Sequence, residues 1–318
     1  MTVPEVICVG RISVDLYALE KDVGFDKPQS FTKSVGGSPT NVAVAAARLG
    51  RHAAIVTKVG NDGFGAFALN QLVKWGVDVD YVGIDSHGQT PLALTALNPA
   101  ETPQIAFYRG NAAPDTTLLA LDLATTDVQN CGVLWVSHGS LAQGTTAAAA
   151  MRWLEVRGRN GHTVFDLDYR PALWPDLETS RRMSLRAIEL STVVVGNLDE
   201  CQMALGTRDP EEAAAALLGA GVKLAVIKMG GDGVYLATND GRFTIDPLRV
   251  EVVSGLGAGD AFGGAMTHGL LSGWTPDVIG QFANAAGALV ASRMACAEAM
   301  PTIEEIEEIR IAKVKETC

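Results

Sequence analysis

The sequence predicts an α/β fold in which a mainly parallel sheet is covered by helices on both faces. Short apolar runs of strand character alternate with longer stretches of helical spacing along most of its 318 residues. This alternation is typical of parallel sheets. Gly50 and Gly76 follow two of the helical stretches, where a C-terminal glycine is expected. Hydrophobic residues make up 47% of the chain, which is enough for a large core.

The elements of the main sheet follow one another in a regular order. A first strand is expected at residues 6–9, where four apolar residues occur in succession. An Ala- and Val-rich helix at residues 41–49, a strand at 53–59 and a helix at 64–75 come next. Later strands are expected at residues 133–136, 163–167, 193–195 and 224–228, with helices near residues 145–159 and 179–190.

Four other segments interrupt this order and predict a second, smaller sheet. Residues 12–19 alternate enough for a strand exposed on one side, and residues 29–35 are a candidate partner. Residues 91–98 and 104–109 predict a hairpin around residues 99–103. We expect a small antiparallel sheet that acts as a lid. An edge extension of the main sheet is the alternative, and periodicity does not distinguish the two.

The expected organisation is one α/β core with a lid inserted into it. The lid comprises residues 11–36 and 91–110, and the core comprises residues 1–10, 37–90 and 111–318. A sheet that is covered on one side only favours association with a second copy, so a homodimer that pairs through the lid is a further expectation.

Composition and charge exclude several classes of protein. The formal charge is −11, which opposes general affinity for nucleic acid or for anionic membranes. The first residues show no basic segment followed by an apolar run, and no later stretch approaches ~20 apolar residues. The five cysteines form no CxxC pair, and the five histidines show no metal-ligand spacing. We expect a cytoplasmic protein with reduced thiols.

A glycine-rich loop near the end of the chain is the most informative motif. It runs Gly255-Leu256-Gly257-Ala258-Gly259-Asp260, after a stretch at residues 243–253 that predicts β structure. Apolar residues recur at helical spacing over residues 261–271, so the loop is expected to open a helix.

The chemistry of this loop favours phosphoryl transfer. A helix N-terminus presents unpaired N–H groups and a positive dipole end, and the backbone of Gly257, Ala258 and Gly259 lets an anion approach closely. A carboxylate at the same point suits a general base that takes a proton from an attacking hydroxyl, so Asp260 is predicted to be that base. The alternative is an ordinary turn in which Asp260 caps the helix.

A second polar motif joins a predicted lid strand to a helix. Gly36 and Gly37 permit close backbone approach, and Asn41 lies near the start of the helix. Asp15, among apolar strand residues, needs a polar partner that the hydroxyls of a sugar would supply. The alternatives are an exposed strand position for Asp15 and a helix cap for Asn41.

Gly36-Gly37 with Asn41, and the Gly257 to Asp260 loop, together resemble the two signatures of the ribokinase-like (PfkB) carbohydrate kinases. The resemblance spans essentially the whole chain and implies a ribokinase-like three-layer α/β/α fold with ATP and Mg²⁺ as cofactors. Asn197-Leu198-Asp199-Glu200 matches the family's Asn-x-x-Glu element, which implies that Asn197 and Glu200 help to hold magnesium, through water.

The resemblance also implies a nucleotide site. Residues 229–233 are similar to the family's nucleotide-binding turn, and residues 283–287 to its adenine-side helix. A plain hairpin turn and a packed helix are the alternatives for these two segments. The residues expected to bind the nucleotide are Asn197, Lys228, Gly230, Gly231, Gly233, Gly257, Gly259 and Asn284.

One departure from the family pattern concerns potassium. Many members carry Asp-Thr-Thr before the catalytic loop, and this chain has Ser254-Gly255-Leu256 there. The missing Asp is linked in the family to monovalent cation binding, so activation by K⁺ is in doubt here. The predicted base and the backbone N–H groups are unaffected.

Three segments resemble most the family members that phosphorylate 5-dehydro-2-deoxygluconate, and nearly as well those that act on 2-keto-3-deoxygluconate. They are residues 10–17, 107–111 and 166–174. Both substrates are sugar acids, and arginine offers a planar fork of donors to a carboxylate. Arg109 and Arg170 are therefore expected to bind the acid group. The alternatives are a surface lid charge for Arg109 and a structural partner of Asp166 or Asp168 for Arg170.

Other functions remain open on the sequence. Within the kinases, a ribokinase, a fructokinase or a nucleoside kinase would not require the two arginines. A non-catalytic sugar or nucleotide sensor could use the same fold. A dinucleotide-dependent oxidoreductase should show Gly-x-Gly-x-x-Gly after the first strand, and residues 9–14 do not supply it.

Overall fold

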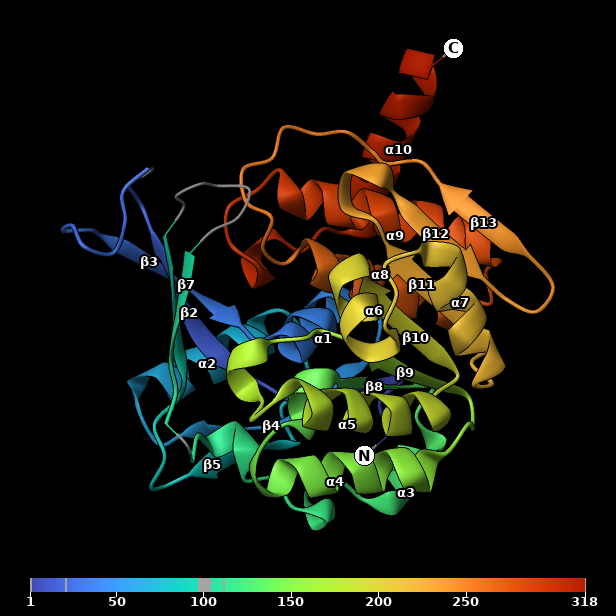
Figure 1. Ribbon diagram of the computed structural model, residues 1–318. Helices are drawn as coiled ribbons and strands as arrows, with labels where there is room; N and C mark the ends of the chain where they lie inside the picture. Colours follow the sequence, from blue (N-terminus) through green and yellow to red (C-terminus); the bar gives the residue numbers. More distant parts are fainter. Residues whose placement is uncertain (1, 21, 97–103, 111, 318) are drawn as a thin grey trace.

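The computed structural model describes residues 2–20, 22–96, 104–110 and 112–317 and contains a large central sheet between two helical layers (Figure 1). Within these residues the sheet consists of β1 (Val6–Val9), β4 (Ala53–Gly60), β5 (Val82–Asp85), β8 (Val133–Ser137), β9 (His162–Asp166), β10 (Val193–Asn197), β11 (Leu224–Lys228), β12 (Val234–Ala237) and β13 (Arg242–Ile245). The strand order is β13-β12-β11-β10-β9-β8-β1-β4-β5.

The seven strands from β11 to β5 run parallel, and β12 and β13 extend the sheet antiparallel at one edge. All six strands expected in the main sheet are present, so the predicted α/β class with a mainly parallel sheet is confirmed. Strand β1 lies near the middle and pairs with β4 and β8. Its residues are all buried because helices cover both faces.

The two helical layers bury two separate hydrophobic cores. One layer contains α1 (Ser38–Arg48), α2 (Gly63–Lys74), α8 (Ala258–Leu271), α9 (Pro276–Ala291) and α10 (Ile303–Thr317). The other contains α3 (Thr125–Asn130), α4 (Gly144–Arg157), α5 (Leu177–Glu189), α6 (Leu198–Leu205) and α7 (Pro210–Gly219). Side chains of β1 alternate between the cores: Val6 and Cys8 face the first, Ile7 and Val9 the second.

Short 3₁₀ turns connect several of these elements. They are η1 (Pro114–Thr116), η2 (Ala120–Asp122), η3 (His138–Leu141), η4 (Pro171–Leu173), η5 (Gly230–Asp232) and η6 (Ala297–Ala299). None of the helices that the structure describes is long and apolar enough to cross a bilayer.

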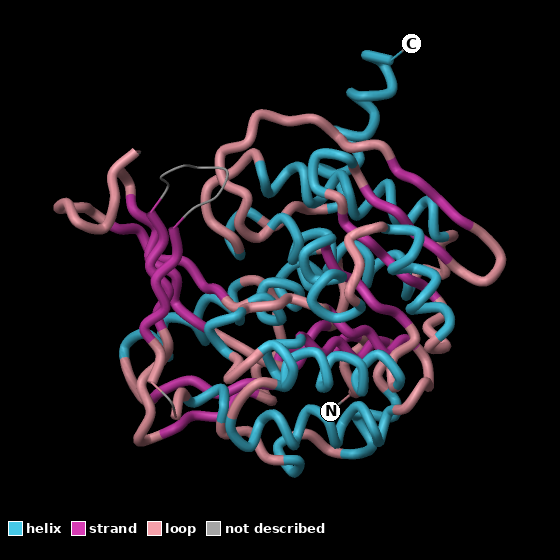
Figure 2. Tube along the Cα trace, in the orientation of Figure 1, coloured by secondary structure: helices cyan, strands magenta, loops and turns pink. Residues whose placement is uncertain are grey.

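A smaller sheet stands beside the core, at the left of Figures 1 and 2. Its strands are β2 (Ser13–Ala18), β3 (Phe31–Gly36), β6 (Leu92–Ala96) and β7 (Gln104–Tyr108), in the order β3-β2-β6-β7. It is separate from the main sheet, so the alternative of an edge extension is wrong. The turn expected around residues 99–103 lies outside the described residues.

One pairing in this sheet differs from the prediction. The pairs β2–β3 and β6–β7 are antiparallel as expected, but the central pair β2–β6 is parallel. The reason is the connection: the chain between β3 and β6 passes through α1, β4, α2 and β5 of the core. Strand β6 therefore enters from the core in the same direction as β2, and no hairpin dictates an antiparallel pair.

The β structure predicted over residues 243–253 is also largely absent. Strand β13 ends at Ile245, and residues 246–257 have no regular structure before α8 begins. Pro247, two residues after the end of β13, has no N–H to continue a ladder. Asn284 of α9 donates from Nδ2 to the carbonyl oxygen of Asp246 at 2.9 Å, which fixes the start of the irregular segment.

Helices α1 and α8 approach each other closely because small residues line their contact. A Cβ on Gly264 would lie 2.3 Å from the Cβ of Ala45 and 3.0 Å from the nitrogen of Ala46. The two helices carry Asn41 and Asp260 in their first turns. Their spacing therefore sets the distance between these two side chains.

Replacing Gly264 by Val is expected to lower the free energy of unfolding by about 1–3 kcal/mol, because the added carbons overpack this contact. Urea denaturation measures the change. Gly219→Ala is the matched control, since a Cβ there meets no atom within 4 Å. Equal losses in the two variants would contradict the assigned packing.

Candidate active site

Three polar side chains lie at the same edge of the main sheet. Asp166, Asn197 and Lys228 are the last residues of the neighbouring strands β9, β10 and β11. Asn197 and Lys228 are directly paired in register, and Asp166 lies opposite Val195. Because carboxyl ends of parallel strands meet at one edge, the three side chains share a crevice of the kind in which open α/β sheets bind ligands.

The glycine-rich loop opens α8 at this crevice. Gly257 is the N-cap, with φ 81°, in the left-handed region that favours glycine. The N–H of Ala261 bonds back to the carbonyl oxygen of Gly257 at 2.9 Å. The N–H groups of the preceding residues Ala258, Gly259 and Asp260 therefore remain at the open end of the helix, where the dipole favours an anion.

Asp260 is held by hydrogen bonds from α1. Ser38 Oγ donates to Oδ1 at 2.7 Å, and Asn41 Nδ2 donates to Oδ2 at 2.7 Å. The Asp260 side chain does not cap α8, and Asn41 lies inside α1 behind the N-cap Gly37, so both helix-cap alternatives are wrong. Burial, with a contribution from Asp168, raises the pKa of Asp260 to about 6.

Ser38 was not singled out from the sequence. Its position three residues before Asn41 places both side chains on one face of a helix, and that spacing was the available signal. Gly37 makes the arrangement possible: its φ is 99°, and a Cβ there would lie 2.3 Å from the carbonyl oxygen of Arg11.

Asp15 reaches the crevice from the small sheet. A Cβ on Gly36 would lie 2.1 Å from either carboxylate oxygen, so Asp15 lies directly over that glycine. Ser13 Oγ donates to it at 2.7 Å. Burial raises the pKa of Asp15 to about 6, and the charge of Asp260 contributes to the shift. The alternative of an exposed strand carboxylate is wrong, because the group is half-buried.

Both predicted arginines form ion pairs. Arg109 Nη2 lies 2.7 Å from Oδ1 of the buried Asp115, and its side chain is 12% exposed, so it is not a surface charge. Arg170 Nη2 lies 2.7 Å from Oδ1 of Asp168, which is one of the structural partners considered from the sequence. The Arg170 side chain remains 46% exposed.

Lys228 lies among carboxylates at the centre of the crevice. Burial alone would lower its pKa, but the charges of Glu200, Asp166 and Asp260 raise it. A Cβ on Gly259 would lie 3.2 Å from Lys228 Nζ. The ammonium group is therefore close to the open end of α8, and both present positive charge to one space.

A cavity of about 710 Å³ extends from this space. The expected residues on its wall are Asn197, Lys228, Gly230, Gly231, Gly233, Gly259 and Asn284, whereas Gly257 is not on it. Residues 229–233 form the hairpin turn between β11 and β12, as the alternative interpretation of this segment expected. Three of its glycines also lie on the cavity wall, so the two interpretations are compatible. Missed from the sequence were Pro247, Leu248, Val250 and Val252, which form an apolar wall where a strand was expected.

Asn197 and Glu200 also close the first turn of α6. Asn197 Oδ1 accepts from the N–H of Glu200 at 2.9 Å, and Glu200 Oε2 accepts from the N–H of Asn197 at 2.7 Å. Glu200 keeps a second carboxylate oxygen, a donor type that suits Mg²⁺. In the described part of the chain, no three His, Cys, Asp or Glu side chains converge on one metal position.

Comparison with known proteins identifies the family. The model of the pfkB family carbohydrate kinases matches residues 3–303. This chain belongs to the pfkB family of carbohydrate kinases. Two relatives, from Clostridium tetani and Bacillus subtilis, are named 5-dehydro-2-deoxygluconokinase and are each 32% identical. The alignments cover 98% of this chain and 94% of the first relative, and 96% of this chain and 95% of the second.

Solved structures of pfkB-type kinases share the fold. A putative ribokinase II from E. coli, in complex with ATP and Mg²⁺, is 26% identical, with a TM-score of 0.88 over 97% of this chain and 99% of that one. A fructokinase from Xylella fastidiosa with bound ATP is also 26% identical, with a TM-score of 0.84 over 97% and 98% of the two chains. The predicted ribokinase-like fold is confirmed.

Replacing Ser38 by Ala is expected to raise the pKa of Asp260 above its value of about 6. The hydroxyl stabilises the ionised carboxylate, so its loss favours the protonated form. An NMR titration of the carboxyl carbon measures the shift. Ser184→Ala, which removes a buried hydroxyl bonded to a backbone carbonyl, is the control. A lower pKa in Ser38→Ala would contradict the assigned contact.

Proposed function

We propose that this protein transfers the γ-phosphate of ATP to a hydroxyl of a sugar acid, 5-dehydro-2-deoxy-D-gluconate. The observation that carries the proposal is the position of Asp260, which accepts two hydrogen bonds from α1 beside the open N-terminus of α8. The family and the names of the full-length relatives support the substrate. 2-Keto-3-deoxygluconate is the second candidate, because it also carries a carboxylate.

Asp260 acts as the general base in this proposal. It takes the proton from the acceptor hydroxyl while that oxygen attacks the γ-phosphate in line. Backbone N–H groups of Gly257, Ala258 and Gly259 stabilise charge on the transferring group, and Lys228 adds a fixed cation next to them. The base must be ionised to act, so with a pKa of about 6 turnover falls as the pH drops below that value.

ATP occupies the cavity of about 710 Å³. The turn glycines Gly230, Gly231 and Gly233 border this cavity. Asn284 lies on the part of the wall that we assign to the adenine ring of ATP. One N–H of Asn284 Nδ2 is bonded to Asp246, so the side-chain oxygen and the second N–H are left for the nucleotide. The apolar wall from the irregular segment packs against the purine, so shape contributes much of the recognition.

Asn197 and Glu200 would hold Mg²⁺ through water. Mg²⁺ commonly retains waters and binds substrate phosphates, which fits a site without a full protein cage. When bound, the ion neutralises charge on the phosphates. K⁺ remains doubtful, because Ser254-Gly255-Leu256 replaces the family's cation-linked segment. Buried free thiols, among them Cys8 and Cys201, agree with a reducing cytoplasm as the site of ATP-dependent turnover.

The sugar acid lies between the lid and the crevice. Asp15 and Asn41 bind its hydroxyls over the backbone of Gly36 and Gly37, and Arg109 and Arg170 face its carboxylate. Residues 11–36 and 91–110 act as the lid, which covers the sugar and excludes water that would otherwise accept the phosphate.

The purified protein is expected to release ADP with 5-dehydro-2-deoxygluconate faster than with fructose, ribose or adenosine, because only the acid engages the arginines. 2-Keto-3-deoxygluconate and added K⁺ complete the panel. Asp260→Asn should keep ATP binding and lose turnover by about 10²–10⁴-fold. Full turnover in that variant would exclude Asp260 as the base, and preference for a neutral sugar would exclude the acid pocket.

We also propose that two copies pair through their lids. Phe31, Ile105, Phe107 and Tyr108 of the small sheet are exposed large side chains, and such patches favour association. Phe107→Asp is expected to convert a dimer into a monomer in sedimentation velocity experiments. Leu121→Asp, at an exposed leucine outside the small sheet, is the control. A wild-type monomer at micromolar concentration would contradict the pairing.

A further inference from the structure

Asp168 bonds two arginines at once. Arg11 Nη2 lies 2.6 Å from Oδ2 of Asp168, and Arg170 Nη2 lies 2.7 Å from Oδ1. The side chains of Arg11 and Asp168 are nearly buried, at 10% and 5% exposed, whereas that of Arg170 is 46% exposed. The negative charge of Asp168 thus lies between the positive charges of the two arginines, and only Arg170 is exposed enough to meet a ligand. We call the three side chains the Arg11–Asp168–Arg170 triad.

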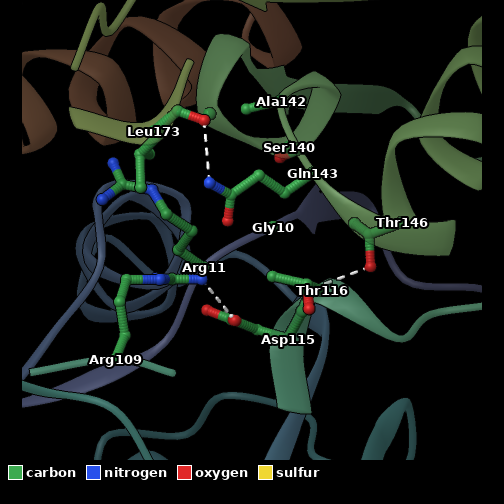
Figure 3. Close-up of a pocket in the computed structure, with 11 residues that line it drawn as sticks. Gly10, Arg11, Arg109, Asp115, Thr116, Ser140, Ala142, Gln143, Thr146 and Leu173 are labelled. Atoms are coloured by element: carbon green, nitrogen blue, oxygen red, sulfur yellow. Dashed lines mark hydrogen bonds and ion pairs between the residues drawn. The ribbon is translucent and has the colours of Figure 1, made fainter. Parts of the chain in front are cut away.

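The Arg11 side chain is almost completely enclosed, with 10% of it exposed. The cavity beside it measures about 10 Å³, which is room for about one water molecule. Figure 3 shows Arg11 and Arg109 among the residues that line this cavity. A Cβ on Gly139 would lie 2.8 Å from Arg11 Nε, so the guanidinium is closely packed against the η3 turn. The ion pair of Arg11 is with Asp168, so this carboxylate is its most direct route to the acceptor.

The charge count explains what Arg11 contributes. Asp168 and Arg170 alone would form a neutral pair, and the carboxylate would compete with any anion for the guanidinium. With Arg11 bonded to the other oxygen, the triad carries a net charge of +1, because two cations share one anion. Burial would raise the pKa of Asp168, but Arg170 and Arg11 lower it, so the carboxylate is ionised and both bonds are charge-assisted.

The surroundings make this compensation necessary. Glu200, Asp260 and Asp166 also act on Arg170, and each is a potential negative charge. An anionic substrate that approaches such a group of carboxylates is repelled unless a cation remains uncompensated there. Lys228 lies among the same carboxylates, towards the open end of α8.

We propose that Arg11 is a positioning residue for acid recognition: it balances the charge of Asp168 and leaves the Arg170 guanidinium available to the substrate carboxylate. The inference rests on the proposed sugar-acid kinase activity and names the residue behind its specificity. Arg11 acts on affinity for the acid group and has no part in the phosphoryl transfer.

The test compares Arg11→Met with the double variant Arg11→Met/Asp168→Asn. The single variant leaves a neutral pair, so the KM for 5-dehydro-2-deoxygluconate should rise about tenfold or more, with a smaller change in kcat. The double variant removes both charges and restores a net +1, so much of the lost affinity should return. The KM for a neutral analogue with CH₂OH in place of the carboxylate should hardly change in either variant.

Arg51→Met is the matched control, because it removes another arginine–carboxylate pair, with Glu5 at 3.2 Å. It should leave the KM for the acid unchanged. Thermal unfolding and ATP binding show whether each variant is folded. A double variant that binds the acid no better than the single one, or equal KM increases for acid and neutral analogue, overturns the inference.

The wild-type arm separates this inference from the proposed function. Wild-type turnover of the acid with an unchanged KM in Arg11→Met rejects the role of Arg11 alone. If the wild-type protein turns over neutral sugars and not the acid, the sugar-acid function is rejected. The inference about Arg11 is then rejected too, because it requires an acid as the ligand.

Discussion

The contact between Asp260 and α1 is the interaction on which the site depends. Ser38 and Asp260 are 222 positions apart in the chain, and their bond joins the start of α1 to the start of α8. The glycine contact of Gly264 with Ala45 brings the two helices close enough for it. Both helices lie on one face of the sheet and bury one core. The packing of that core therefore positions a buried carboxylate, whose charge is stable only with its two donors.

The sequence allowed the parallel sheet to be predicted, because its strands are short apolar runs such as residues 6–9, and burial on both faces requires that pattern. The start of α8 could be predicted from the glycine-rich loop that precedes it. The parallel pairing of β2 with β6 could not be predicted, since it depends on how the chain returns from the core. Val250 and Val252 have strand character, yet they line the cavity of about 710 Å³, because the ladder ends at Ile245 and Pro247 cannot continue it.

The site residues also divide into those that local sequence identifies and those that depend on tertiary structure. Asp260 and Asn41 could be identified because they lie in short motifs whose backbone geometry is local. Arg11 could not, because only the order of β9, β8 and β1 in the sheet brings it to Asp168, 157 positions away. A buried arginine after an apolar strand requires a carboxylate, but nothing in the sequence says which one. Arg109 and Arg170 were expected, whereas their dependence on Asp115 and Asp168 is a tertiary property.

The charges at the crevice bear on how an acidic protein could receive the two anions that we propose, ATP and a sugar acid. Its carboxylates lie at the ends of β9 and in α6 and α8, and each is compensated locally: Asp168 by two arginines, Glu200 and Asp166 by Lys228, and Asp260 by neutral donors from α1. Burial raises the pKa of Asp260 although its two neutral donors lower it, and a raised pKa suits the general base that we propose. Arg170 and Arg11 instead lower the pKa of Asp168 and hold that carboxylate ionised, whereas burial raises the pKa of Asp166 to about 8 despite the charge of Lys228. The acids of one crevice thus differ in how readily they ionise, since Asp166 and Asp260 have raised pKa values and Asp168 has a lowered one. The difference comes from burial and from the partners that the fold supplies to each.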